Sequence, residues 1–217
     1  MMEDQERGQE LICVIDDDED VRASLKSLLR SAGYEARTFA SPEEFMDSAD
    51  DAACLILDVR LRNADGLAFQ EELIASEASI PIVLMTGYGD IPMSVRAMKA
   101  GAVNFLSKPF AEDDMIAAVE EAVERSRGNR RQAEEEAGLR IRLESLTARE
   151  REVMGLVTAG LMNKQVAARL GVSEITVKIH RGNLMRKMQA QSLADLVRMA
   201  DTLGVRETSV SRYAKPS

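Results

Sequence analysis

The chain has 217 residues, enough for one large or two ordinary domains, and its hydrophobic content of 45% is sufficient for packed cores. No apolar run approaches the roughly 18 residues that would suggest a membrane span. The acidic, polar start MMEDQERGQE is not a secretory signal, so we expect a cytoplasmic protein that does not contact a membrane. One histidine and two cysteines are too few for a zinc module.

Charge is divided unevenly along the chain. From Leu146 onward, 12 Lys/Arg stand against 6 Asp/Glu, a net charge of +6, whereas the remainder holds 16 against 31, a net charge of −15. The overall net charge of −9 argues against indiscriminate coating of nucleic acid. A basic C-terminal module can nevertheless bind phosphates.

Four apolar runs are typical of strands, and each is followed by charged or hydroxyl residues. The runs are residues 11–15 before Asp16, Asp17 and Asp18, residues 54–57 before Asp58, residues 82–85 before Thr86, and residues 103–106 before Ser107 and Lys108. Ligands of open α/β sheets bind beyond the carboxyl ends of the strands. We therefore interpret the convergence of acids, a hydroxyl and an ammonium as a magnesium-assisted phosphoacceptor site.

Helical spacing of apolar residues separates these runs. A first helix ends at Gly33, residues 34–39 predict a further short strand, and Ser41-Pro42 predicts a helix start with Ser41 as N-cap. Further helical patterns cover residues 67–74, 95–101 and the stretch from about residue 111. Five βα units in sequence predict a doubly wound parallel sheet with helices on both faces.

The stretch from Glu120 to Arg142 is highly charged and contains few large apolar residues. Its plain interpretation is a solvated linker, helical in part, with Gly128-Asn129 as a candidate break; whether the linker is one continuous helix stays open. The alternative is a helical spacer that also pairs two protomers.

From Leu146 the pattern predicts short helices and no strands. Thr147 to Glu150 has the form of a capping box, and helices over 163–170 and 174–188 flank a turn at residues 171–173. This is the helix-turn-helix pattern, although αα-corners of ordinary folds look similar. The second helix presents residues suited to phosphates and base edges, namely Thr176, Lys178, Arg181, Arg186 and Lys187. The apolar stripe of a last helix, 192–203, fits either core packing or a dimer seam.

Together these motifs resemble a known family. VIDDDEDVRASL, LILDVRLRNADGL and VLMTGYGDIPMSVRAMKAGAVNFLSKPF resemble the receiver domain of two-component response regulators, over residues 11–125. LTAREREVMGLVTAGLMNKQVAARLGVSEITVKIHRGNLMRKM resembles the LuxR-type DNA-binding domain, over residues 146–205. The whole is similar to a FixJ-type transcriptional regulator. The resemblance implies a (βα)5 receiver, a charged helical linker at 126–145, an all-α four-helix DNA-binding domain, and polar extensions at 1–10 and 206–217.

The resemblance also implies roles for individual residues. Asp58 matches the phosphoacceptor, Thr86 and Lys108 match the residues that contact the phosphoryl oxygens, and Phe105 matches the aromatic residue that changes rotamer on activation. The implied ligands of Mg²⁺ are Asp16, Asp17, Asp58 and the backbone carbonyl of Arg60. Oxygen donors of this kind are those that Mg²⁺ requires.

The function implied by the resemblance is that of a phosphorylation-controlled transcription factor. A sensor histidine kinase would supply the phosphoryl group, and the receiver would catalyse only its own phosphorylation and dephosphorylation. Phosphorylation would either release the DNA-binding domain or pair two receivers in a homodimer. The active protein would then bind double-stranded promoter DNA, regulating and typically activating transcription with RNA polymerase. Whether the resting protein is a monomer or a preformed dimer stays open.

Two other functions are alternatives. A phosphohydrolase that uses Asp58 as a transient nucleophile would need a general acid two residues later, where Arg60 stands. A regulator that works through protein contacts alone would not need the complete set of acids, threonine and lysine.

Some residues have simpler interpretations, and one departs from the family pattern. Asp18 is interpreted as a helix cap, and Cys13 and Cys54 as buried, reduced thiols. Most receivers have Met-Pro where this chain has Leu61-Arg62, so the loop loses a proline that fixes φ and gains a cation. We expect altered loop mobility and an altered phosphoryl lifetime.

Overall fold

The computed structural model describes residues 10–48, 51–76, 80–87 and 91–206. The chain forms two compact units, Met1–Arg130 and Arg131–Ser217. Apart from Glu10 and Arg206, the two predicted polar extensions lie outside the described residues.

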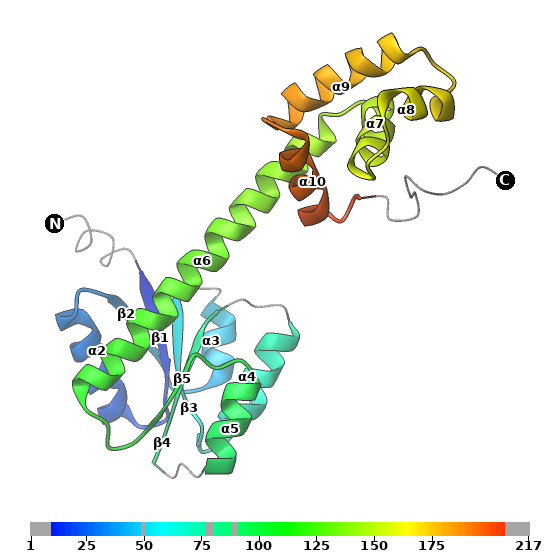
Figure 1. The fold of residues 1–217 in the computed structure, drawn as a ribbon. Coiled ribbons are helices and arrows are strands. Elements are labelled where there is room, and N and C mark those ends of the chain that lie inside the picture. Colours follow the sequence, from blue (N-terminus) through cyan, green and yellow to red (C-terminus); the bar gives the residue numbers. More distant parts are fainter. Residues whose placement is uncertain (1–9, 49–50, 77–79, 88–90, 207–217) are drawn as a thin grey trace. The chain divides into compact units, whose positions relative to one another are not determined.

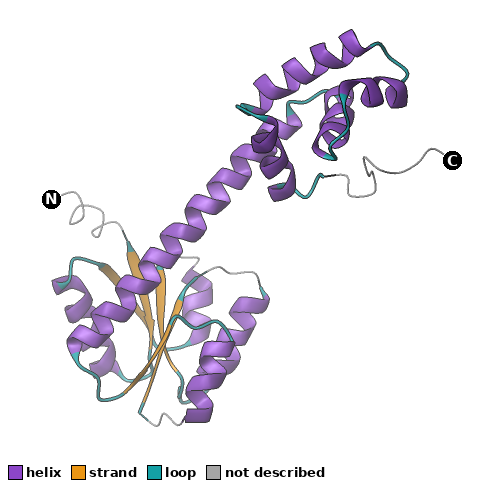
Figure 2. Cartoon of the chain, viewed as in Figure 1, coloured by secondary structure: helices purple, strands orange, loops and turns teal. Residues whose placement is uncertain are grey.

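The first unit is built on a five-stranded parallel sheet with the strand order β2-β1-β3-β4-β5 (Figures 1 and 2). The strands are β1 (Leu11–Ile15), β2 (Glu35–Phe39), β3 (Cys54–Asp58), β4 (Ile82–Thr86) and β5 (Asn104–Ser107). In the register, Asp58 pairs with Met85 and Thr86 pairs with Ser107, so the strands end side by side. The predicted parallel sheet is confirmed.

Two layers of helices cover the sheet, one on each face. The helices are α2 (Glu19–Ser31), α3 (Pro42–Ser48), α4 (Gly66–Ala75), α5 (Ile91–Lys99) and the first part of α6 (Glu112–Glu144). Leu29 of α2 and Val119 of α6 pack with alternate strand residues such as Ile56 on one face. Phe69 of α4 and Ala97 of α5 pack on the opposite face. Alternating side chains of the same strands therefore fill two separate cores.

The two cysteines lie inside these cores. Cys13 and Cys54 are fully buried free thiols, in agreement with the sequence-based interpretation. Burial raises the pKa of the Cys54 thiol, so it stays protonated and unreactive near neutral pH.

Helix α6 runs without a break from Glu112 to Glu144, so Gly128-Asn129, the candidate break, lies inside a continuous helix. The carboxylate of Glu10 explains part of this continuity, since it accepts hydrogen bonds from Arg127 Nε at 3.0 Å and Arg130 Nη2 at 2.8 Å. These contacts lie on both sides of the glycine-asparagine pair. A glycine within a helix costs only about 1 kcal/mol, which such contacts can offset.

Among its described residues, the second unit contains helices and no strand. Its helices after α6 are α7 (Ala148–Thr158), α8 (Asn163–Leu170), α9 (Glu174–Met188) and α10 (Leu193–Thr202). The predicted capping box is present, with Thr147 Oγ1 accepting from the Glu150 backbone N–H and the Glu150 carboxylate accepting from the Thr147 backbone N–H. Leu196 and Ala200 of α10 are buried in the core, whereas Leu193 is partly exposed. Across the ranges that the structure describes, no helix is long and apolar enough to cross a membrane.

A buried carboxylate joins the first and third helices of this unit. Glu150 Oε2 lies 2.7 Å from Lys187 Nζ, which also donates to the backbone carbonyl of Ser145 at 3.0 Å. The side chain of Glu150 is only 4% exposed. The hydrogen bond from Lys187, aided by the Thr147 backbone N–H, holds the pKa of Glu150 below its ordinary value despite the opposing effect of burial.

We expect this pair to make the stability of the second unit dependent on acid pH. A carboxyl whose pKa is lower in the folded state stabilises the fold above its unfolded pKa, and that contribution is lost as the pH falls through the folded pKa. Glu150→Gln should lower the free energy of unfolding at pH 7 by about 1 kcal/mol, the difference between a hydrogen bond to a charged acceptor and one to a neutral acceptor.

Hydrogen exchange of α7 and α9 amides at pH 7 and pH 4 measures this effect. The variant should lose less protection than the wild type on acidification. Glu152→Gln, which removes an exposed carboxylate that pairs with Arg149, is the matched control and should behave as the wild type. Equal acid sensitivity of Glu150→Gln and the wild type would contradict the prediction.

Candidate functional site

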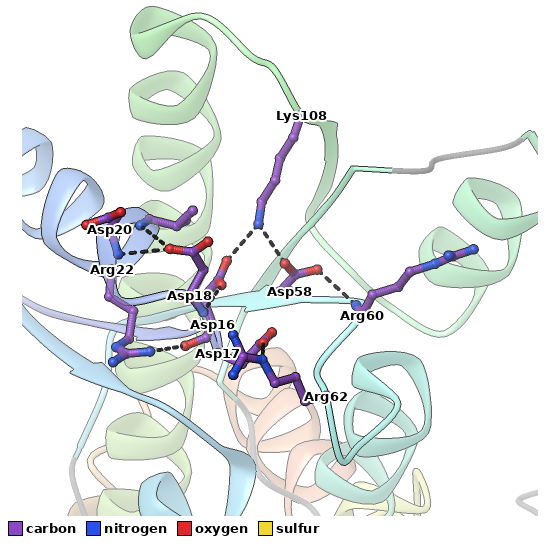
Figure 3. Close-up of polar contacts among 10 residues, drawn as sticks. Asp16, Asp17, Asp18, Asp20, Arg22, Asp58, Arg60, Arg62 and Lys108 are labelled. Atoms are coloured by element: carbon purple, nitrogen blue, oxygen red, sulfur yellow. Dashed lines mark hydrogen bonds and ion pairs between the residues drawn. The ribbon is translucent and has the colours of Figure 1, made fainter.

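The carboxyl ends of β1, β3, β4 and β5 bring the predicted site residues together (Figure 3). Asp58 and Thr86 are the last residues of β3 and β4, and Lys108 directly follows β5. Asp16 and Asp17 directly follow β1. The chain forms this edge because all four strands run in parallel and end at the same level.

Lys108 joins two of the carboxylates. Its Nζ lies 2.7 Å from Asp16 Oδ2 and 2.6 Å from Asp58 Oδ2, as Figure 3 shows. The side chains of Asp16 and Asp58 are only 1% and 9% exposed. Two carboxylates removed from water are costly unless they are paired, so the ammonium is what allows both to lie at this edge.

The pKa values of Asp16 and Lys108 reflect the balance between burial and pairing. Burial raises the pKa of Asp16, against the lowering effect of its hydrogen bonds from Lys108 and from the Asp18 backbone N–H. Burial alone would lower the pKa of Lys108, but the hydrogen bonds to Asp16 and Asp58 outweigh it and raise that pKa. Lys108 therefore stays charged at neutral pH.

The loop after β3 fixes the other oxygen of Asp58. Its Oδ1 accepts a hydrogen bond from the backbone N–H of Arg60 at 2.9 Å. The loop closes on itself through a bridge between Arg60 and Asp65, and the Gly66 N–H donates to the Val59 carbonyl at 3.0 Å. A Cβ at Gly66 would lie 2.2 Å from the Asp58 carbonyl oxygen, so only glycine fits where α4 begins.

The acids that follow β1 differ in their partners. Asp18 caps α2, accepting from the backbone N–H groups of Asp20 and Val21, in agreement with its interpretation as a cap. Asp17 Oδ2 instead lies 2.8 Å from Arg62 Nε. Arg22 holds the turn itself, because its Nη1 donates to the Asp16 carbonyl at 2.7 Å.

The remaining two predicted residues lie on β4 and β5. Thr86 is fully buried at the end of β4, and its carbonyl accepts a hydrogen bond from the Lys108 N–H at 2.7 Å. Phe105 is half-buried and packs against the core beneath α3, α4 and α5. Phe105 packs on the face covered by α3, α4 and α5, and Thr86, two residues after Leu84 on β4, belongs to the same face.

The donor atoms at this edge fit Mg²⁺. The carboxylate oxygens of Asp16, Asp17 and Asp58 and the backbone carbonyl of Arg60 are hard oxygen donors of the kind that Mg²⁺ prefers. Asp16 and Asp58 already reach a common cationic atom, Lys108 Nζ. Among the described residues no three acidic, histidine or cysteine side chains are gathered as ready-made metal ligands. Asp17 is the one of these three acids that pairs with a different cation, Arg62.

In the second unit, α9 carries all five predicted DNA contacts. Ser173 caps the helix, and its Oγ lies 2.8 Å from Thr176 Oγ1. Arg181 Nη1 donates to Asn163 Oδ1 at 3.0 Å, and Arg186 donates to Asn183 Oδ1.

Lys178 differs from these residues. It is exposed, and within the part of the chain that the structure describes its ammonium has no hydrogen bond or ion pair. Lys187 is occupied by Glu150 and Ser145, which makes it the least available of the five.

Sequence reasoning missed several residues that shape these surfaces. Arg22 and Gly66 carried no recognised signal, although a glycine after Asp65, the N-cap of α4, could have marked a close approach. On α9, Ile175 and Ile179 are 71% and 59% exposed, on the same side of the helix as Lys178. Their signal was an apolar spacing that does not match the buried Val177, Leu184 and Met188.

Comparisons with known proteins agree with both units. Residues 12–120 match the response regulator receiver domain family, and residues 144–200 match the luxR family of bacterial regulatory proteins. The chain is 52% identical over 197 residues to nodulation protein W of Bradyrhizobium diazoefficiens, covering 90% of this chain and 87% of that protein. It is 40% identical over 196 residues to the transcriptional regulatory protein FixJ of the same organism, covering 89% and 96%. Among solved structures, the response regulator StyR is 44% identical, with a TM-score of 0.76 over 88% of this chain and 98% of that one.

We expect Gly66→Ala to shift the backbone beside Asp58 and so to disturb the acidic edge, by which we mean Asp16, Asp17 and Asp58 at the ends of β1 and β3. The added methyl group must push the start of α4 away from the Asp58 carbonyl, and overpacking of this kind costs about 1–3 kcal/mol. Urea unfolding followed by tyrosine fluorescence, to which the buried Tyr34 contributes, measures the loss.

Gly128→Ala is the control for this substitution. Apart from the backbone of its own helix, no atom lies within 4 Å of a Cβ at Gly128. This variant should therefore be as stable as the wild type or up to about 1 kcal/mol more stable. Equal stability of Gly66→Ala and Gly128→Ala would show that α4 can move away without cost.

Proposed function

The chain belongs to the two-component response regulators that carry a receiver and a LuxR-type DNA-binding domain, and we propose that phosphorylation of Asp58 controls its binding to promoter DNA. It is a transcriptional regulator of the FixJ type, and not an enzyme that turns over a separate substrate. Its receiver implies a histidine kinase as partner, and its helix-turn-helix implies DNA binding. The observation that carries the proposal is the pairing of Asp58 and Asp16 through Lys108 at the sheet edge.

In the proposed reaction, Asp58 is the nucleophile. Its Oδ1 is held by the Arg60 N–H, and Lys108 is close enough to bind an oxygen of the incoming phosphoryl group. Asp16, Asp17, Asp58 and the Arg60 carbonyl are the proposed ligands of Mg²⁺, which neutralises charge on the phosphoryl oxygens when bound. Little covalent help is needed beyond an aligned nucleophile and cations, and this edge offers both.

The proposed switch acts through Thr86 and Phe105. A phosphoryl group adds about −1.5 to −2 charges at neutral pH, which would draw Thr86 and Lys108 toward Asp58 and let Phe105 turn inward. Helix α5, which contacts β5, exposes the apolar side chains of Ile91 and Val95, by 80% and 45%. We propose that this face, formed by α5, β5 and the start of α6, pairs two phosphorylated chains.

We propose domain bounds of 11–125 for the receiver, 126–145 for the linker and 146–205 for the DNA-binding domain, with polar extensions at 1–10 and 206–217. The matched ranges, 12–120 and 144–200, support them. DNA contacts are proposed for Thr176, Lys178, Arg181, Arg186 and Lys187 of α9, with RNA polymerase as a further partner at the promoter. Ile175 and Ile179 are suited to apolar contact with thymine methyl groups in the major groove.

The first experiment is phosphorylation with Mg²⁺ and a small-molecule phosphodonor. Mass spectrometry should find one phosphoryl group on Asp58, and sedimentation should shift toward a dimer. Asp58→Asn should show neither change, because its amide cannot form the acyl phosphate. Asp18→Asn is the control, since Asp18 caps α2 and should leave phosphorylation intact. A wild-type protein that gains no phosphoryl group would contradict the proposal.

A second experiment tests the DNA surface of α9. Lys178→Ala should weaken binding to double-stranded DNA and lower the slope of log affinity against log salt by about one, as expected for one lost phosphate contact. Lys187→Met should lower that slope less, because Glu150 occupies its ammonium, and should instead destabilise the helical unit. Fluorescence anisotropy over a series of salt concentrations measures both slopes. Equal slopes for the wild type and Lys178→Ala would exclude Lys178 from the contact surface.

A further inference from the structure

We propose that Arg62 is a positioning residue for the metal site: an internal counter-ion of Asp17 that Mg²⁺ must displace. The inference rests on the proposed phosphoacceptor function and adds a control on its metal affinity. It follows from the ion pair between Arg62 Nε and Asp17 Oδ2 (Figure 3). Arg62 lies in the loop that follows β3.

The charges at the sheet edge are divided between two cations. Lys108 pairs with Asp16 and Asp58 at 2.7 and 2.6 Å, and Arg62 pairs with Asp17 at 2.8 Å. Each of the three carboxylates proposed to bind Mg²⁺ thus already has a positive partner. Lys108 can release one carboxylate oxygen and keep its role beside the phosphoryl group, whereas Arg62 occupies Asp17 alone.

The local backbone explains why Arg62 reaches back to Asp17. The loop is fastened at its base by the Arg60–Asp65 bridge and by the hydrogen bond from Gly66 to Val59. Its tip, residues 61–64, contains Arg62, whose Nε reaches Asp17 in the turn after β1. The ion pair with Asp17 joins that tip to β1, so a change of partner at Asp17 also changes what holds the loop.

A pocket beside the loop provides space for the displaced guanidinium. Its volume is about 380 Å³, and its lining includes Asp17, Ser41, Glu43, Arg62 and Asn63. Glu43 lies at the start of α3 and contributes a second carboxylate to the lining. Arg62 can leave Asp17 for this pocket without entering the core.

We expect Arg62 to change the affinity for Mg²⁺ only modestly, because the Arg62–Asp17 pair is near the surface. The side chain of Arg62 is 79% exposed and that of Asp17 is 23% exposed. An exposed ion pair is worth at most about a fivefold change in an equilibrium constant. Arg62 therefore lowers the affinity for Mg²⁺ without preventing binding.

Titration of the full-length chain with Mg²⁺, followed by calorimetry, tests the inference. Arg62→Met keeps the aliphatic length and removes the charge, and it should bind Mg²⁺ about two- to fivefold more tightly than the wild type. Arg62→Lys should lie closer to the wild type. The matched control is Arg37→Met, which removes an exposed arginine that pairs with Glu35 on β2 and should change the affinity much less.

A spectroscopic readout follows Arg62 directly. The Nε–H signal of Arg62, identified by its loss in Arg62→Met, should shift and exchange faster with water when the wild type is saturated with Mg²⁺. A signal that stays protected at saturation would overturn the inference, as would equal or weaker affinity of Arg62→Met relative to Arg37→Met. Asp17→Asn separates the two proposals, because it should weaken Mg²⁺ binding whatever Arg62 does. If the wild type binds no Mg²⁺, the proposed phosphoacceptor site fails, and this inference fails with it.

Discussion

The ammonium of Lys108 is the interaction on which the acidic edge depends. Asp16 and Asp58 are almost completely buried, and two unpaired carboxylates in that position would oppose folding. Lys108 lies within 2.7 Å of both, and its backbone N–H is bonded to the carbonyl of Thr86. Its side chain and main chain thus connect the ends of β1, β3, β4 and β5. Any group that changes the charge of Asp58 must therefore also change the hydrogen bonds of Lys108.

The same constraint organises the residues around it. Lys108 pairs with Asp16 and Asp58, so the third carboxylate, that of Asp17, needs a different cation. Arg62 is that cation. Gly66 lets α4 start directly against the main chain of Asp58. Arg22 holds the turn after β1 by donating a hydrogen bond to the Asp16 carbonyl. A rigid backbone with exchangeable cation partners is suited to a site that gains and loses a doubly charged group.

The sequence was informative wherever a pattern is local. Apolar runs ending in acids predicted the strands and the position of Asp58, and the capping box predicted the start of α7. Longer-range pairings were not predictable, because nothing in the local pattern connects Glu10 with Arg127 or Glu150 with Lys187. The first pair contributes to the continuity of α6, and the second explains why the ammonium of Lys187 is already bound. The sequence shows that Arg62 replaces the proline of most receivers. Only the structure shows that Arg62 pairs with Asp17.

The anchoring of α6 constrains how a change at Asp58 can be transmitted within the first unit. Met115 and Val119 are fully buried against the sheet, and Glu10, at the opposite end of β1 from Asp16, holds Arg127 and Arg130. A helix held along this length resists sliding, because sliding would break both the apolar packing and the ion pairs together. Helix α5 has fewer buried restraints. Ala97 is its one fully buried residue among those described, its ion pair with α4, Arg96 to Glu71, is exposed, and its apolar side chains Ile91 and Val95 face water. Movement of the face formed by α5 and β5 thus costs less free energy than displacement of α6. This favours transmission of a change at Asp58 through a new protein contact at that face.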